Sequence, residues 1–563
     1  MAKHFSFGFT AYRIHLDSRW LTVISALYFT TVLNLSLWRY ILRHLTVADT
    51  ATFFFGISIP IVIFTALYLL FNLLLIPYLA KPVLILLLFI ASATNYFMFE
   101  YGIFIDSGMI RNVFETNTRE ALDLMTLRFI LWVIVGGVLP AICLTVTRID
   151  YQSFRTECKS RLFAITGCLI TTGMIAALFF KEYASFGRNH QDTHRLINPI
   201  STIYATGRYL HIRSLVDKQL RRLDASAKLM PYEGSVPAVF ILVVGETARA
   251  ANFSLNGYPR DTNPLLSKEN VIAFQDVYSC GTATATSVPC MFSNMTREHF
   301  HADNARYTEN LMDLLQQTGF NVLWLENDDG CKEVCNRVPT RKVYKSGDPR
   351  YCDGQSCFDE ILLDNLEEYI ANVKKDTFIV LHTIGSHGPT YYKRYPETFR
   401  KFRPTCDTSD LQNCTREEII NTYDNTILYT DYVVSNAIGI LKKFPHLESG
   451  LLYISDHGES LGENNIYLHG LPYSIAPEEQ KKVPMVLWMS DTMQKLDHLN
   501  YGCIARQATD KTWSHDNLFH TLLALMEIRS NTYDKTLDIF DDCRTKPLPW
   551  NTAARPVTIS ATD

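Results

Sequence analysis

The sequence predicts an α-helical membrane domain of five transmembrane helices, followed by an α/β domain with a mainly parallel central sheet. Long uncharged apolar runs are confined to the first third of the 563 residues, whereas short apolar runs alternate with helical stretches after Val236. All but three of the 13 cysteines also lie in this second part. The formal net charge of -4 leaves no basic excess, so we expect no nucleic-acid partner.

Five segments lack Asp, Glu, Lys and Arg over about the 18–20 residues that a spanning helix needs. They are residues 20–38, 51–80, 82–99, 129–147 and 162–180. We therefore expect a membrane domain over residues 1–181, with helices at about 20–40, 51–76, 82–99, 128–147 and 162–181. Pro60 and Pro77 predict a kink or an early end in the second helix. The first run is too long for a cleavable signal peptide.

Flanking cations predict the orientation of these helices. Lys3, Arg13 and Arg19 precede the first helix, and a basic cluster over residues 148–161 separates the fourth from the fifth. Both regions should be cytoplasmic, although Arg39 and Arg43 after the first helix argue weakly for the opposite orientation. An odd number of helices then puts everything after residue 181 on the other side of the membrane.

The cysteines of the second part agree with that orientation. Eight of them form close pairs, and Cys503 and Cys543 are left over. None of the pairs has the CxxC spacing of a zinc ribbon, so five disulfides in an oxidising compartment are favoured over reduced thiols. Spacing alone does not prove which cysteines are joined.

The loop of residues 100–126 lies between the third and fourth helices. Its apolar residues recur at near-helical spacing and predict an amphipathic helix at the membrane interface: Met109, Ile110, Val113, Phe114 and Leu122. The segment could be a simple connector, or its polar residues could face a lipid headgroup; taken alone, the sequence favours the connector. After the fifth helix, residues 182–235 read as a basic linker with short helices.

The predicted α/β domain covers residues 236–546, and residues 547–563 read as a disordered tail. Apolar runs predict strands at residues 238–244, 271–277, 321–325, 378–381, 451–454 and 484–489. Helical spacing predicts helices at residues 309–318, 359–373, 417–443 and 515–526.

Ligand-type side chains follow two of these strands. Asp456 and His457 come directly after strand 451–454, with His469 nearby, and Glu246 follows strand 238–244. The carboxyl ends of parallel strands are where ligands bind, and Zn²⁺ accepts both carboxylate oxygen and imidazole nitrogen. Alternatively, Asp456 caps a turn, His457 is an ordinary loop residue, and Glu246 pairs with Arg249.

Small hydroxyl residues crowd the segment 280–290, which reads CGTATATSVPC and enters a helix. A hydroxyl at a helix N-terminus lies where backbone N–H groups favour negative charge, which suits a nucleophile that attacks phosphorus. The simpler alternative is that these residues only cap the helix. Further along, Lys332 is a plausible phosphate contact, and the strand at 378–381 leads to His382 and His387.

At this point the chain resembles the membrane-bound lipid A phosphoethanolamine transferases, a family that includes the mobile colistin-resistance enzymes. The family belongs to the alkaline phosphatase superfamily, so the resemblance implies an α/β domain of alkaline phosphatase/sulfatase-like type. It covers essentially the whole chain and rests on GETARAANFSLNGYPRDTNP, SCGTATATSVPCMF, LHTIGSHGPTYY, the YDN at residues 423–425 and SDHGESLGENNIYLHG.

The resemblance implies a nucleophile and a metal site. Thr284 matches the residue that takes up phosphoethanolamine from phosphatidylethanolamine as a covalent intermediate. Glu246, Asp456 and His457, with the Thr284 oxygen, match the ligands of one catalytic zinc. Transfer to a lipid A phosphate would lower the negative surface charge and give resistance to polymyxin and colistin. The implied location is a multi-pass position in the bacterial inner (cytoplasmic) membrane with the catalytic domain in the periplasm, and we expect a monomer.

Other matching positions are implied to bind substrate or a second ion. His387 and His469 match histidines that hold a second zinc, contact substrate or protonate a leaving group. Lys332 and Glu459 match residues that line the pocket. Positions that match a proposed ethanolamine contact are Asn112, Thr116 and Glu120. The implied disulfides are Cys280–Cys290, Cys331–Cys335, Cys352–Cys357, Cys406–Cys414 and Cys503–Cys543.

Two departures and three rival functions remain at this stage. Asp328 and Asp329 stand where some relatives carry asparagine, which could shift headgroup contacts. The acceptor could instead be another lipopolysaccharide or glycan group. A phosphodiesterase- or sulfatase-type hydrolase is also possible, although Thr284 stands where sulfatases carry a cysteine or serine. The third rival is a membrane sensor without catalytic activity.

Overall fold

The computed structural model describes residues 15–45, 50–116, 118–180, 182–183, 186, 191–215, 219–230, 236–328, 330–354, 356–548 and 550. The expectations for Lys3, Arg13, Asp329 and the tail from residue 551 lie outside the described residues, as do parts of the basic linker. The chain divides into two compact units. One consists of Met1–Ile110 with Met125–Tyr209, and the other of Arg111–Leu124 with Leu210–Asp563.

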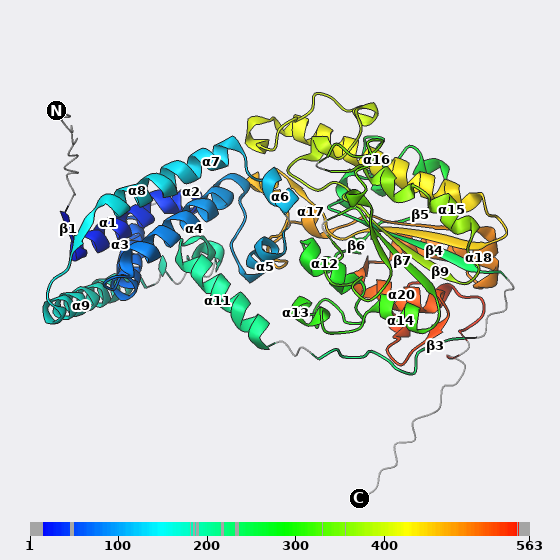
Figure 1. Cartoon of the computed structure of the whole chain (residues 1–563), viewed down its shortest axis with the longest axis horizontal. Helices are drawn as coiled ribbons and strands as arrows, with labels where there is room; N and C mark the ends of the chain where they lie inside the picture. Colours follow the sequence, from blue (N-terminus) through cyan, green and yellow to red (C-terminus); the bar gives the residue numbers. More distant parts are fainter. Residues whose placement is uncertain are drawn as a thin grey trace, which may run out of the picture. The chain divides into compact units, whose positions relative to one another are not determined.

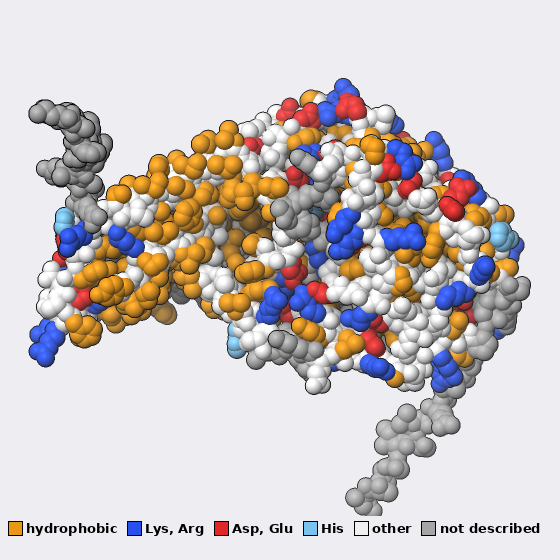
Figure 2. Space-filling view, viewed as in Figure 1, with side chains coloured by type: hydrophobic (Ala, Val, Ile, Leu, Met, Phe, Trp, Pro, Cys, Tyr) orange, Lys and Arg blue, Asp and Glu red, His pale blue; other side chains and the backbone are white. Residues whose placement is uncertain are grey.

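Within its described residues, the first unit contains five helices long and apolar enough to cross a membrane, as predicted (Figure 1). They are the α1–η1–α2 segment Ser18–His44, α3 (Thr50–Leu74), α4 (Ala80–Tyr101), the α7–η2–α8 segment Leu127–Val146, and α9 (Phe154–Leu178). Pro60 lies inside α3, which ends before Pro77. Large apolar side chains are exposed along these helices, and Figure 2 shows hydrophobic atoms over most of their visible surface. Such a surface is suited to lipid rather than water.

A seven-stranded sheet forms the centre of the second unit, in the order β5–β13–β10–β4–β9–β7–β8. Its strands are β4 (Ala238–Gly245), β5 (Ile272–Phe274), β7 (Asn321–Glu326), β8 (Thr340–Lys342), β9 (Thr377–His382), β10 (Glu448–Ser455) and β13 (Met485–Met489). Neighbouring strands from β10 to β8 pair in parallel, which confirms the mainly parallel sheet. β13 pairs antiparallel with β10 and β5. The sequence did not predict this direction, because a buried strand has the same apolar pattern in a parallel and in an antiparallel pair.

Helices cover both faces of this sheet (Figure 1). Alternate residues of β4 point to opposite sides, so Phe240 and Leu242 join one apolar cluster while Val239 and Ile241 join the other. The first cluster includes residues of α14 (Leu311–Gln317) and α20 (Leu518–Leu525), and the second includes residues of α15 (Leu366–Ala371) and α16 (Arg416–Lys442).

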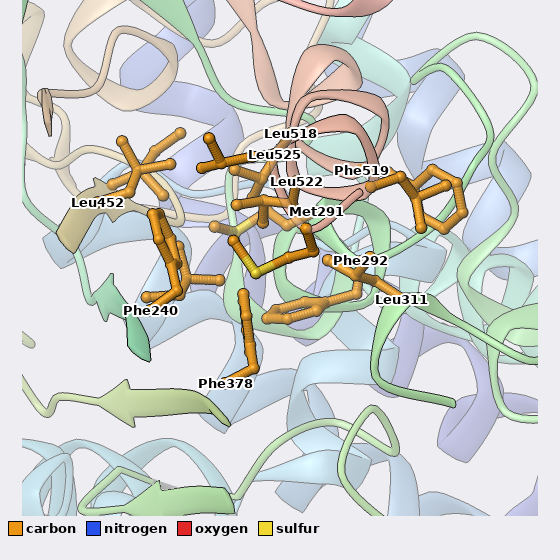
Figure 3. Packing of buried hydrophobic residues seen from close by; sticks show 14 of the residues in the cluster. Phe240, Met291, Phe292, Leu311, Phe378, Leu452, Leu518, Phe519, Leu522 and Leu525 are labelled. Atoms are coloured by element: carbon orange, nitrogen blue, oxygen red, sulfur yellow. The ribbon is translucent and has the colours of Figure 1, made fainter. Parts of the chain in front are cut away.

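The short helix α12 (Thr284–Met291) is anchored in the first apolar cluster by its C-terminal end. Met291 and Phe292 are fully buried, and Figure 3 shows them among side chains that include Phe240. The Phe292 ring also lies 5.4 Å from the Trp324 ring, measured between centroids. This packing holds the helix, and with it Thr284 at its first residue, against the sheet.

Five disulfides connect the described cysteines of the second unit. They are Cys280–Cys290, Cys331–Cys335, Cys352–Cys357, Cys406–Cys414 and Cys503–Cys543. The pair Cys280–Cys290 joins the loop before α12 to the last turn of that helix. The backbone that carries Thr284 is therefore fixed by a covalent bond as well as by packing.

The segment Arg111–Leu124 belongs to the second unit, although it lies between two spanning helices in sequence. It carries the end of α5 (Ser107–Glu115) and α6 (Thr118–Asp123), so the expected amphipathic helix is divided into two short ones. Arg111 forms an ion pair with Asp303. Three large apolar side chains of the segment are exposed: Val113, Phe114 and Leu122.

Asp123 ties this segment to the turn that carries His387. Its carboxylate accepts hydrogen bonds from Thr390 Oγ1 at 3.0 Å, Lys393 Nζ at 3.1 Å and Arg394 Nη2 at 3.2 Å. Arg394 Nε in turn donates to the His387 carbonyl at 2.9 Å. Arg394 is 4% exposed, so loss of the carboxylate would leave a buried cation poorly paired.

We expect Phe292→Ala to lower the free energy of unfolding of the second unit by about 3–5 kcal/mol, because it leaves a cavity in the core. The measurement is a urea titration of the purified full-length protein in detergent micelles. Met295→Ala is the control, since Met295 is 38% exposed and its truncation should change stability by less than about 0.5 kcal/mol. An unchanged urea midpoint for Phe292→Ala would contradict the anchoring role.

Asp123→Asn should loosen α6, at a cost of about 1–3 kcal/mol for a charge-assisted network. Hydrogen exchange followed by mass spectrometry should show faster exchange of the α6 amides. Burial raises the pKa of Asp123, but Arg394 and Lys393 outweigh it and the pKa is lowered. The stability that the ionised Asp123 carboxylate contributes is therefore present above about pH 4 and is lost as the pH falls further. The control Glu397→Gln, in an exposed ion pair with Arg403, should leave exchange unchanged.

Candidate active site

Glu246 and Asp456 are brought together by the pairing of β4 with β10. The two strands run in parallel with Gly245 opposite Ser455, and the Asp456 N–H donates to the Gly245 carbonyl at 2.9 Å. The next residue on each strand therefore projects from the same edge of the sheet. The turn that follows β9 fixes the Glu246 backbone from the other side, because the Ser386 N–H donates to the Glu246 carbonyl at 3.0 Å.

The two oxygens of Asp456 have different surroundings. Oδ1 accepts hydrogen bonds from the N–H groups of Thr247, at 3.1 Å, and His457, at 2.7 Å. Oδ2 is buried and has no hydrogen-bond partner among the described residues. It lies 3.3 Å from Nε2 of His457, whose Nδ1 donates to the Gly458 carbonyl at 2.9 Å. The backbone thus orients both side chains and leaves Oδ2 and Nε2 facing one point.

Thr284 and Glu246 complete this group of four side chains. Thr284 Oγ1 lies 3.2 Å from both carboxylate oxygens of Glu246 and 3.4 Å from His457 Nε2. Glu246 Oε1 lies 3.3 Å from the same nitrogen. Glu246, Asp456 and His457 are fully buried, and Thr284 is 9% exposed. The structure therefore brings together all four residues that the sequence grouped.

Burial of two carboxylates beside one imidazole perturbs all three groups. Burial and the negative charge of Glu246 raise the pKa of Asp456 to about 8. Burial would lower the pKa of His457, but Asp456 and Glu246 outweigh it and raise the pKa to about 10. A cation among these atoms would relieve the repulsion between the carboxylates.

The donor set fits a zinc ion. Two carboxylates, one imidazole and one hydroxyl are ligand types that zinc accepts, and the ligand atoms of Glu246, Asp456 and His457 lie within 4.8 Å of one another. The buried Asp456 Oδ2 has no hydrogen-bond partner in the described ranges of the chain, and a cation there would supply the missing interaction. Glu246, Asp456 and His457, together with the Thr284 hydroxyl, could therefore hold a metal ion.

Helix α12 presents Thr284 at its first residue, and Ala283 is its N-cap. The N-cap makes no side-chain hydrogen bond, so the alternative that a hydroxyl caps this helix is wrong. Ser287 Oγ instead accepts from the Gly281 N–H at 3.0 Å and shapes the preceding loop. The Thr284 hydroxyl is left free to point at the Glu246 carboxylate.

His469 and His387 lie at the edge of this buried group. Their ring centroids are 5.4 Å apart, and the His469 ring is 4.4 Å from that of His457. His469 Nδ1 is 3.1 Å from the fully buried Glu459 carboxylate, which fixes the ring's orientation. Both rings are partly exposed, so they are accessible to a substrate.

The remaining expected site residues lie in the second unit. Lys332 is half-buried in the loop after β7. Its positive charge favours the ionised forms of Asp328 and Glu115. Thr116 Oγ1 donates to the Asn112 carbonyl at 2.6 Å, which closes the end of α5. The side chain of Glu120 lies outside the described residues.

The sequence carried no indication of the role of His515 or of the partner of Arg249. His515 Nδ1 accepts from the Cys280 N–H at 3.1 Å and Nε2 donates to the Ser455 carbonyl at 3.0 Å, so it joins the nucleophile loop to β10. Burial lowers its pKa to about 3, which keeps the ring neutral. Arg249 pairs with Glu463 at 2.9 Å, so the less favoured alternative, a Glu246–Arg249 pair, is wrong. His515 lies 60 residues after Ser455 and is not part of any local motif, so no sequence pattern indicated it.

Comparison with known proteins agrees with this geometry. Residues 63–213 match the family model of phosphoethanolamine transferases EptA/EptB, and residues 238–528 match the sulfatase model. Phosphoethanolamine transferase EptA of Escherichia coli (strain K12) is 44% identical over 531 residues, which cover 93% of this chain and 96% of that protein. Phosphatidylethanolamine transferase Mcr-1 of Escherichia coli is 37% identical over 528 residues, covering 91% and 95%.

A solved structure shows the same fold. The integral membrane protein lipooligosaccharide phosphoethanolamine transferase A (EptA) from Neisseria meningitidis superposes with a TM-score of 0.92 at 39% identity, covering 94% of this chain and 99% of that one. Both the helical unit and the sulfatase-type α/β unit are included in this match. The resemblance of the sequence motifs is therefore confirmed, and the chain belongs to the EptA/EptB family of phosphoethanolamine transferases.

Proposed function

We propose that the protein transfers phosphoethanolamine from phosphatidylethanolamine to a phosphate of lipid A through a covalent Thr284 intermediate at a zinc site. The observation that carries this proposal is the Thr284 hydroxyl, 3.2 Å from the Glu246 carboxylate at the start of a helix and beside Asp456 and His457. The names of the relatives EptA and Mcr-1 support the donor and the group transferred.

Glu246, Thr284, Asp456 and His457 would hold the zinc. When bound, it would lower the pKa of the Thr284 hydroxyl and neutralise charge on the phosphoryl oxygens. A second zinc between His387 and His469 is compatible with the distance between their rings. The protein would act as a monomer.

The first step forms a bond between Thr284 Oγ and phosphorus and breaks the bond from phosphorus to the diacylglycerol oxygen. Glu246 receives the hydroxyl proton, and the backbone N–H groups at the start of α12 stabilise the phosphoryl oxygens. His469, oriented by Glu459, would protonate the departing diacylglycerol oxygen. In the second step a lipid A phosphate oxygen forms a bond to the same phosphorus and the bond from phosphorus to Thr284 Oγ breaks. Glu246 returns its proton to Thr284 Oγ, and His469 regains a proton from the attacking phosphate or from water.

The segment Arg111–Leu124 and the loop of Lys332 would bind the headgroup. Lys332 would pair with the donor phosphate, and Asn112, Thr116 and Glu120 would contact the ethanolamine. The membrane is the bacterial inner membrane, with the catalytic unit in the periplasm, as the cation distribution and the five disulfides favour. The product carries an ammonium group, so it would repel cationic peptides such as colistin.

Thr284→Ala should reduce transfer by on the order of 10³-fold or more, because no nucleophile remains. Mass spectrometry of lipid A from cells with and without the protein measures the product, and it also identifies any other acceptor. Intact-protein spectra should show a phosphoethanolamine adduct on the native chain and none on the variant. Thr284→Ser retains the hydroxyl and should retain part of the activity. Modified lipid A produced by a folded Thr284→Ala protein would refute the covalent mechanism.

Chelation should also abolish transfer, and added Zn²⁺ should restore it. Asp456→Asn should lower the zinc content of the purified protein, since it removes the charge of the ligand whose Oδ2 lacks a partner. The measurement is elemental analysis by inductively coupled plasma mass spectrometry. Full activity in a chain that has been shown to contain no zinc would exclude the proposed metal role.

A further inference from the structure

A second convergence of buried ligand atoms lies beside Glu246. Asp328 follows β7 and His382 ends β9, so both project from the same edge of the sheet as Glu246. Their ligand atoms and those of Glu246 all lie within 4.8 Å of one another. Glu246 and His382 are fully buried, and Asp328 is 4% exposed. The catalytic scheme above uses neither Asp328 nor His382.

The His382 ring is held with one nitrogen directed at this group. Its Nδ1 lies 3.0 Å from both oxygens of the Glu326 carboxylate. Glu326 is oriented in turn by Trp324 Nε1–H and by the Asp328 N–H, each donating at 2.8 Å. A carboxylate that binds Nδ1–H while Nε2 points away is the arrangement that orients metal-ligating histidines.

The other ring nitrogen makes no hydrogen bond in the part of the chain that the structure describes, although it lies at ion-pair distance from Asp328. His382 Nε2 is buried and has no hydrogen-bond partner among the described residues. It lies 3.8 Å from Asp328 Oδ2, which is too far for a hydrogen bond. A purely ionic network would bring a protonated Nε2–H into hydrogen-bond contact with that oxygen. The observed gap instead leaves room for an ion between the nitrogen and the two carboxylates.

We propose that Glu246, Asp328 and His382 bind a second divalent cation, Zn²⁺ or Mn²⁺, and share the Glu246 carboxylate with the catalytic zinc site. Two carboxylates and one imidazole suit either ion, and three protein ligands leave a position open for water or a substrate oxygen. Two cations on one carboxylate would add a second positive charge beside the phosphoryl group. That Glu246 is shared with a catalytic zinc rests on the proposed function, whereas the binding of the second ion does not.

The test counts metal ions in the full-length protein in detergent micelles after equilibrium dialysis against Zn²⁺ or Mn²⁺. His382→Gln and Asp328→Asn should each bind about one ion per chain fewer than the native protein. The control Asp497→Asn, a buried carboxylate near Glu448 at the opposite end of β10, should bind as many ions as the native chain. Equal contents for the native chain and both site variants would overturn the proposal.

A second measurement removes the dependence on variant folding. Anomalous diffraction from crystals of the native protein soaked in Mn²⁺ or in Zn²⁺ should show a peak among Glu246, Asp328 and His382. No peak there with either ion at saturating concentration overturns the proposal. The double variant Asp456→Asn/His457→Gln separates the two sites, because it should lose the catalytic zinc but keep the peak. An unchanged zinc content in that double variant would contradict the proposed function and leave the second site standing.

Discussion

The parallel pairing of β4 with β10 is the constraint on which the site depends. It sets Gly245 opposite Ser455, so Glu246 and Asp456 emerge side by side although they are 210 positions apart in sequence. Hydrogen bonds from Thr247 and His457 then hold one oxygen of Asp456 and direct the other inward. Because the backbone makes these contacts, the site is organised before any ligand binds.

The arrangement concentrates buried negative charge at one edge of the sheet. Glu246, Asp328 and Asp456 are all buried there, and His382 and His457 are the imidazoles that face them. Such a group is stable only when it is protonated, hydrogen-bonded or bound to cations. The apolar clusters on both faces of the sheet hold α12 and α16 in place and offset the cost of burying this charge.

Many of the residues in the candidate site could be predicted from the sequence, because the motifs at the strand ends are local. The short apolar strand with Asp456 and His457 at its end lies within eight consecutive residues, and so does the run of hydroxyl residues that contains Thr284. The links between them are not local. His515 joins Cys280 to Ser455, Arg249 pairs with Glu463 rather than Glu246, and β13 runs against its neighbours; each depends on residues distant in sequence.

The sequence by itself determined five membrane-length helices, a mainly parallel α/β unit and the identity of the candidate ligands, because hydrophobic periodicity and residue chemistry are properties of short segments. Only the tertiary structure decided that Arg111–Leu124 packs with the α/β unit, that Ala283 rather than a hydroxyl residue caps α12, and that His382 turns an unpartnered nitrogen toward Asp328. Those outcomes depend on the register of strands and on side-chain packing, which join positions that no local pattern relates.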